Sequence, residues 1–189
     1  MILYHGTVSK NAISIIENGI DLSVCQIHTD FAQGFYLTPD RYQAIRWAER
    51  KTAAAKTWFK YPVVLSYSVD SKIFTSLHTK IFKTTNIEWA QFIINNRCGM
   101  DYALGGEYHD QNIDKKYDVV IGYIADGQIT DLAKQLEKEN REVSENELIK
   151  IINPHYPKQY SFHTQRALEI LGNARYNKIQ KGELKYVQK

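Results

Sequence analysis

The stretches YHGT (residues 4–7) and DFAQGFYLT (residues 30–38) carry the most specific information in this sequence about its fold. A short apolar run around His5 and Gly6 predicts a strand, and the apolar and aromatic residues around Tyr36 predict another. A glycine in a strand often marks a bulge or a close approach of two backbones. Each stretch therefore has a structural explanation when it is considered alone.

The segments that follow these two stretches predict helices. Residues 9–19, SKNAISIIENG, predict a helix with Ser9 as its N-cap and Gly19 at its C-terminal end. Residues 38–56 predict a longer helix with Thr38 as its N-cap and a proline in the first helical position. A strand followed by a helix is thus predicted twice in the first third of the chain.

The rest of the chain predicts further strands and helices in an irregular order. Strand-like segments and a final hairpin are predicted at residues 61–69, at 117–126, at 158–164 and around Gly182. Two capping boxes and a capping threonine predict helix starts at Thr85–Glu88, Ser144–Glu147 and Thr164. Because strands and helices do not alternate regularly, we expect an α+β fold. No linker or repeat divides residues 1–189, so we expect one domain.

Composition limits the classes of protein to which the chain can belong. It has 189 residues, 43% of them hydrophobic and 24% charged, which is ordinary for a globular domain. No run approaches the roughly 18 apolar residues of a membrane helix, and MILYHGTVSK lacks the order of a signal peptide. We therefore expect a cytoplasmic protein without a membrane segment. Cys25 and His28 form a C-x-x-H without a second ligand pair, so no metal site is predicted.

The net charge of +3 is unevenly distributed. Residues 174–189 contain five basic residues and one glutamate, a net charge of +4 that exceeds the total for the whole chain. A basic segment with two tyrosines is compatible with contact to the phosphates of a nucleic acid. An edge strand that lysines protect from aggregation gives the same pattern, and we favour that interpretation.

The spacing of several residues around the two opening stretches resembles one known layout. The elements are His5-Gly6, Asn11, Gly19-Ile20, the F-x-x-G-F-Y-L of residues 31–37, and Trp47 eleven residues after Tyr36. This layout resembles the ADP-ribosyltransferases of the poly-ADP-ribose-polymerase and diphtheria-toxin branch. Their signature is a histidine on the first strand, a tyrosine on a later strand and usually a glutamate near the end.

The likeness extends over most of the chain. EWAQFIINNR (residues 88–97), YDVVIGYIAD (117–126) and QYSFHT (159–164) are similar to a bacterial family of the same superfamily whose domain carries an unknown-function label. The resemblance implies two packed central sheets, antiparallel or mixed, flanked by helices. It also implies that NAD is the co-substrate, cleaved between nicotinamide and ribose through a transition state with oxocarbenium character.

The resemblance implies a role for each residue of the layout. His5 would bind a ribose hydroxyl, and the backbone of Gly6 would pair with the nicotinamide carboxamide. Tyr36 and Trp47 would stack on the two faces of the nicotinamide ring, an aromatic pair suited to a flat cation. The remaining residues assigned to NAD binding are Thr7 and Asn11.

Two positions differ from the family pattern. Relatives often carry a serine eight residues after the motif tyrosine, where this chain has Ala44. The third signature position is Gln159 instead of glutamate. A glutamate can act as a general base, whereas a glutamine can only form hydrogen bonds. Glu107 and Asp126 are candidate substitutes for the carboxylate.

These residues lead to a first hypothesis with two alternatives. The first is a bacterial or phage mono-ADP-ribosyltransferase, a toxin or effector that modifies a protein side chain or a nucleic acid and is restrained by an antitoxin protein. His5, Tyr36 and Gln159 would be its catalytic residues. An alternative is a module that holds NAD or ADP-ribose without turnover. An NAD-consuming RNA phosphotransferase ranks last, because the seven arginines of the chain are scattered.

Overall fold

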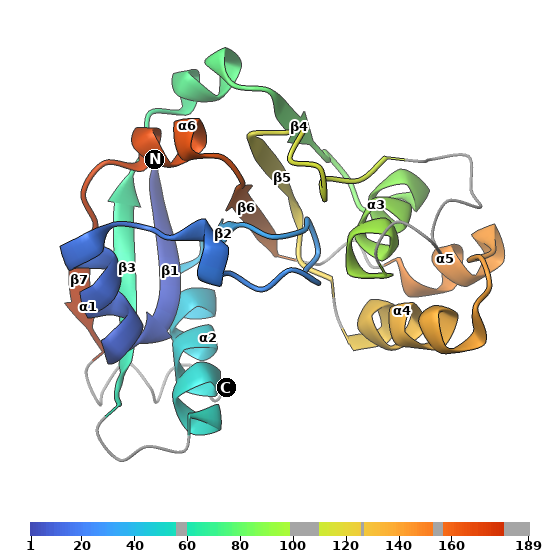
Figure 1. Ribbon diagram of the computed structural model, residues 1–189, viewed down its shortest axis with the longest axis horizontal. Coiled ribbons are helices and arrows are strands. Elements are labelled where there is room, and N and C mark those ends of the chain that lie inside the picture. The colour runs from blue at the N-terminus through green and yellow to red at the C-terminus, as the bar shows by residue number, and fades with distance from the viewer. Residues whose placement is uncertain (56–59, 99–109, 126, 153–156, 180–189) are drawn as a thin grey trace.

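The computed structural model describes residues 1–55, 60–98, 110–125, 127–152 and 157–179. Over these ranges the chain forms two β-sheets with helices packed around them (Figure 1). The α+β class is therefore confirmed. None of the described helices has both the length and the apolar character that crossing a bilayer requires.

The first sheet contains β1 (Ile2–Val8), β3 (Pro62–Ser68) and β7 (Arg175–Lys178), in the order β1-β3-β7. All neighbouring strands in it are antiparallel, and β1 lies at one edge. Two helices lie beside this sheet in Figure 1: α1 (Ser9–Asn18) and α2 (Arg41–Ala54). Small and branched side chains form the buried contact of α2 with the sheet: Ala44, Ile45, Ala48 and Val64.

The second sheet has four strands in the order β2-β6-β5-β4. These are β2 (Phe35–Leu37), β6 (Lys158–Phe162), β5 (Val119–Tyr123) and β4 (Thr79–Ile81). β4 and β5 are parallel, and the other neighbours are antiparallel. The sequence of β5, VVIGY, is an apolar run because apolar residues cover the strand on both faces, with Val120 in one core cluster and Val119 and Ile121 in the other.

The two sheets meet where β1 passes β2. Tyr4 donates its backbone N–H to the Thr38 carbonyl at 2.8 Å, and Thr38 donates to the Tyr4 carbonyl at 2.9 Å. A shared apolar core lies between the sheets and includes Leu3, Phe35, Leu65, Tyr67, Val119 and Phe162. This contact brings the YHGT and DFAQGFYLT stretches side by side.

Three helices form a separate group on the second sheet (Figure 1). They are α3 (Ile87–Cys98), α4 (Gly127–Glu139) and α5 (Glu145–Ile151). Their core contains Trp89, Phe92, Ile129 and Leu136, together with Phe31 from the segment before β2. A short helix α6 (Gln165–Leu168) follows β6, and 3₁₀ turns lie at Leu22–Val24, Ser71–Ser76 and Glu169–Leu171.

The first two helices begin at different residues from those predicted. Ser9 is already helical, and its hydroxyl accepts a hydrogen bond from the Tyr61 N–H at 3.4 Å. α2 begins at Arg41 with Asp40 as its N-cap, so the prediction of Thr38 as the cap is wrong. Thr38 instead extends from β2 into the bridge between the sheets, which places its backbone in a strand conformation.

The later helix starts divide between correct and wrong predictions. At α5 the Glu147 carboxylate accepts from the Ser144 N–H at 2.9 Å, and at α6 the Thr164 hydroxyl accepts from the Ala167 N–H, so both caps are confirmed. At α3 the cap is Asn86, whose Oδ1 accepts from the Trp89 N–H at 2.9 Å. The Thr85–Glu88 box is therefore wrong. The hairpin predicted around Gly182 lies outside the described residues.

Candidate functional site

His5 lies on β1 and contacts the start of β2 through both its ring face and its edge. The ring stacks on Phe35 with centroids 4.4 Å apart, and Nδ1 lies 2.8 Å from the Tyr36 carbonyl oxygen. Since a carbonyl oxygen only accepts, Nδ1 carries the proton and Nε2 is a hydrogen-bond acceptor. Burial, and secondly the positive charge of Lys51, lower the pKa of His5 to about 3. His5 is therefore neutral at pH 7.

The backbone of α2 approaches β1 closely at Gly6. A Cβ atom at Gly6 would lie 1.9 Å from the Ala44 carbonyl oxygen and 2.9 Å from the Ala48 nitrogen. Only glycine fits there without moving the helix. Ala44 is itself buried in this contact, so the position where relatives often carry a serine is used here for packing.

The backbone of Gly6 faces the open edge of the first sheet. Along a strand, successive residues direct their N–H and C=O groups to opposite sides. Tyr4 bonds to Thr38, on the side away from β3, so Gly6 two residues later faces the same way. Among the described residues no partner bonds to its N–H or C=O, although Gly6 is buried. Buried backbone groups are rarely left unpaired, so this pair is suited to a ligand.

Tyr36 is partly buried, and its hydroxyl binds the segment that precedes β2. The hydroxyl donates to the Ala32 carbonyl at 2.8 Å and accepts from the Phe31 N–H at 2.9 Å. Burial raises the pKa of Tyr36 above its usual value, so the hydroxyl stays protonated. Its ring lies between Phe31 and His163, with centroids 6.3 and 6.4 Å away. Tyr36 thus holds the 29–32 segment on the second sheet.

The other residues assigned to NAD lie in different environments. Trp47 is 50% exposed on α2, and the Lys51 ammonium lies 5.9 Å from its ring centroid. The ring of Tyr36 contacts Phe31 and His163. Thr7 follows Gly6 on β1 and is buried, and its hydroxyl has no partner among the described residues. Asn11 is exposed on α1.

Gln159 lies on β6, and its side chain is on the same face of the second sheet as that of Tyr36. Tyr36 pairs with Ser161, and Gln159 is two residues away on the same strand. Gln159 is only 6% exposed, and its Nε2 donates to the Asp30 carboxylate at 2.8 Å and to the Tyr123 carbonyl at 3.3 Å. Tyr36 lies on β2, His5 approaches β2 from β1, and Gln159 lies on β6, the strand paired with β2 on its other side.

Three residues of this region were missed at the level of sequence. Asp30 is buried and pairs with Arg97 from α3, at 2.5 Å between Oδ1 and the guanidinium. His163 is fully buried, contacts the Gln33 carbonyl at 2.9 Å and packs directly on Gly34. Asp30 stands immediately before the F-x-x-G-F-Y-L motif, but no local signal links it to Arg97, 67 residues later.

A protein-family model matches residues 1–172 of this chain and carries the description "Protein of unknown function (DUF3990)". The chain belongs to this family. The match runs from β1 through the 3₁₀ turn after α6 and includes His5, Tyr36 and Gln159. No curated protein and no solved structure matches the chain.

The two candidate substitutes for a catalytic carboxylate, Glu107 and Asp126, lie outside the described residues.

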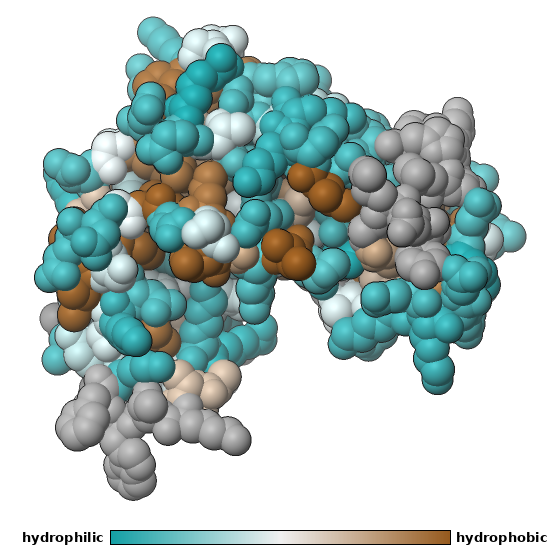
Figure 2. Space-filling model, in the orientation of Figure 1, coloured by the Kyte–Doolittle hydropathy of each residue, from teal (hydrophilic) through white to brown (hydrophobic). Residues whose placement is uncertain are grey.

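Figure 2 shows a hollow in the surface of this DUF3990 chain between α2 on one side and α4 on the other. The segment that joins α1 to β2 lies above it (Figure 1).

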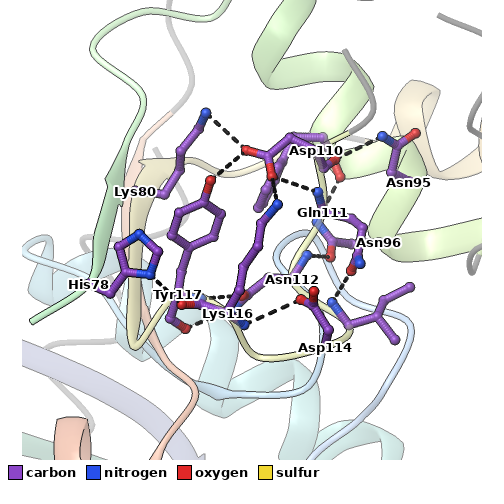
Figure 3. A network of polar contacts seen from close by, with 12 residues as sticks. His78, Lys80, Asn95, Asn96, Asp110, Gln111, Asn112, Asp114, Lys116 and Tyr117 are labelled. Carbon is purple, nitrogen blue, oxygen red and sulfur yellow. Dashed lines mark hydrogen bonds and ion pairs between the residues drawn. The ribbon is translucent and has the colours of Figure 1, made fainter.

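A second polar cluster lies at the outer edge of the second sheet (Figure 3). Asp110 pairs with Lys116 and with Lys80 on β4, at 3.0 Å for Lys80, and accepts from the Tyr117 hydroxyl at 2.9 Å. Burial of Asp110 favours a higher pKa, but the hydrogen bonds from Lys116 and Lys80 hold the pKa below its usual value. Lys80 also pairs with Glu88 at 2.6 Å, so two lysines face two carboxylates, and the cluster anchors the segment before β5.

Proposed function

We propose that this chain is an NAD-dependent ADP-ribosyltransferase that transfers ADP-ribose to a macromolecular acceptor and releases nicotinamide. The observation that supports it most is Gly6, whose buried N–H and C=O face an open edge beside His5. A carboxamide carries one donor and one acceptor group, which complement this pair. Because α2 fills the space on the side-chain side of Gly6, a ligand would reach this pair from the open edge of the strand.

His5 would bind the ribose next to that ring. Its Nε2 is an acceptor whose tautomer is held by the Tyr36 carbonyl, so it is suited to a ribose hydroxyl that donates. The stack on Phe35 keeps the imidazole in place. Because the ring is neutral, it adds no positive charge next to a developing oxocarbenium ion.

The reaction itself breaks the bond between nicotinamide and the ribose carbon, and the electron pair leaves with nicotinamide. A nucleophile of the acceptor then bonds to that carbon and loses its proton. Gln159 cannot take this proton, because an amide is not a base at neutral pH. The acceptor must therefore be ionised already, or be deprotonated by another group. This favours transfer of one ADP-ribose over chain elongation.

The proposal includes the biological setting that the sequence resemblance implies. The chain would act in the cytoplasm of a bacterium as a toxin or effector, with an antitoxin protein as its partner. Its acceptor would be a protein side chain or a nucleic acid. The net charge of +4 in residues 174–189 supports contact with an acceptor that carries phosphates.

The test is nicotinamide release from NAD by the purified protein, with and without a cell lysate as the source of acceptor. We expect His5→Ala to lower the rate about 100-fold, because a group that positions the ribose is lost. His78→Ala is the matched control, since Nδ1 of this exposed histidine also contacts a backbone carbonyl. Equal rates for the two variants would contradict the proposed role of His5.

One observation favours the second candidate function, a module that holds NAD or ADP-ribose without turnover. The Gln159 amide is bound to a buried carboxylate, and no described residue supplies a free carboxylate beside it. Saturable binding of NAD without nicotinamide release, in the presence and absence of lysate, would select this function.

A further inference from the structure

Asp30 accepts hydrogen bonds on both of its carboxylate oxygens. Oδ1 accepts from Arg97, at 2.9 Å from Nε and 2.5 Å from Nη2. Oδ2 accepts from the Ala125 N–H at 3.0 Å and from Gln159 Nε2 at 2.8 Å. Asp30 is 5% exposed, and its carboxylate is held by α3, by β6 and by the segment that follows β5. A buried charge of this kind is stable only when it is fully paired.

These contacts determine the orientation of the Gln159 amide. The two groups next to its end are the Asp30 carboxylate and the Tyr123 carbonyl, and both can only accept. The NH₂ group must therefore face them, and the amide oxygen Oε1 must face the other way. None of the described residues donates a hydrogen bond to Oε1. Gln159 is left with one free acceptor atom.

We propose that Asp30 is a positioning residue, which holds the Gln159 amide so that its oxygen accepts a hydrogen bond from a ribose hydroxyl of NAD. This role rests on the proposed function. In this role Gln159 supplies a hydrogen-bond acceptor, but no general base, at the third signature position. Asp30 keeps that acceptor in its orientation. Gln159 would touch the substrate, and Asp30 would act through it.

The same geometry excludes a glutamate at position 159 while Asp30 is present. A carboxylate oxygen in place of Nε2 would lie 2.8 Å from Asp30 Oδ2 without a proton between them. Arg97 is already paired with Asp30. Two carboxylates in one buried site cannot both be ionised. The glutamine at position 159, where the ADP-ribosyltransferase signature usually has a glutamate, is thus coupled to the presence of Asp30.

A double-mutant cycle tests the coupling without any measurement of activity. We expect Gln159→Glu to lower Tm at pH 7.5 by about 5 °C or more in the native background, and by less than half of that in the Asp30→Asn background. Asp118→Asn is the matched control, because Asp118 also pairs with an arginine, at 2.7 Å from Arg166. Equal losses in the native and Asp30→Asn backgrounds would overturn the proposal.

A pH series provides a second test that needs only Gln159→Glu. Beside Asp30 and Arg97, the introduced carboxyl group would bind its proton more tightly in the folded than in the unfolded state. The folded variant then holds more protons, so its stability relative to the native chain falls as pH rises above about 4.3. We expect the Tm deficit to shrink from pH 7.5 to pH 5. A deficit that does not change with pH would overturn the proposal.

Nicotinamide release then tests the role toward NAD. We expect Asp30→Asn to lower kcat about 10-fold with KM changed less than about twofold, because the bond from the ribose strengthens in the transition state. Asp118→Asn should change neither constant. If the native chain neither binds nor cleaves NAD, the proposed function fails and the positioning role fails with it. If the native chain is active and Asp30→Asn matches it, only the positioning role is overturned.

Discussion

Gly6 combines a packing role with a backbone that has no hydrogen-bond partner among the described residues. Its lack of a side chain lets α2 approach β1, and the alternation of the strand directs its N–H and C=O to the open edge of the sheet beside His5. The glycine of the H-G pair is therefore explained by the structure even without a ligand. A substitution at Gly6 consequently affects stability and binding together.

We predict that Gly6→Ala destabilises the fold by about 3 kcal/mol, or roughly 6–12 °C in Tm for a chain of this size. The reason is the distance of 1.9 Å between the added Cβ and the Ala44 carbonyl oxygen, which forces α2 to move. Thermal unfolding followed by circular dichroism measures the effect. Gly127→Ala is the control, because a Cβ there meets nothing within 4 Å and should leave Tm unchanged or slightly raised. Similar Tm values for both variants would contradict the close contact.

The individual residues of the site were predictable only in part. His5, Tyr36 and Gln159 were named as candidates because each belongs to a short motif with a fixed spacing. Asp30 was not identified, since a carboxylate before an aromatic motif gives no sign of burial. Its partner Gln159 is 129 residues away, and only the fold shows that the two side chains meet.

At the level of elements, the predicted strands and helices agree with the structure more closely than their first residues do. The periodicity of apolar residues extends over a whole element and locates it well. A helix start depends on one side chain and one N–H group, and neighbouring polar residues compete for that position. α3 illustrates this competition, because Thr85 and Asn86 are adjacent and both can cap a helix.

We predict that Asn86→Ala destabilises the protein by about 1 kcal/mol, the usual cost of losing an N-cap. Its Oδ1 accepts from the Trp89 N–H, and alanine would leave that donor without its partner. Thr85→Ala should leave the free energy of unfolding unchanged within about 0.5 kcal/mol. Chemical denaturation of the two variants measures both values. A larger loss for Thr85→Ala would support the capping box predicted from the sequence.

The whole molecule depends on the contact between the two sheets near β2. On one side, Tyr4 and His5 of β1 bond to β2 and to Thr38, which follows it. On the other side, Gln159 of β6 and His163, which follows β6, bond to Asp30 and Gln33 in the segment before β2. Both histidines are held neutral within the fold. Protonation of either histidine would therefore destabilise the contact between the two sheets.

We predict a loss of stability on acidification that depends on His163. Burial lowers its pKa from 6.5 to about 4, so the unfolded chain takes up this proton first. The contribution is complete above pH 6.5 and is lost as pH falls towards 4, with about 2 kcal/mol gone at pH 5. His163→Gln should reduce the difference in the free energy of unfolding between pH 7.5 and pH 5 by that amount. Denaturant unfolding at both pH values measures it.

His78→Gln is the control for this measurement, because His78 is exposed and far along the chain from β6. It should show the same dependence of stability on pH as the native chain. An unchanged dependence in His163→Gln as well would contradict this prediction and show that other groups, such as His5 or carboxylates, control acid unfolding.

The sequence by itself determined the α+β class, most of the strands and helices, and the candidate residues His5, Gly6, Tyr36 and Gln159. These follow from patterns within short segments, where apolar periodicity, caps and motif spacing are local properties. Only the tertiary structure decided that α2 packs on Gly6 and that Asp30 orients the Gln159 amide. Those contacts join segments that are distant in the chain, and the direction of a side chain depends on the packing around it.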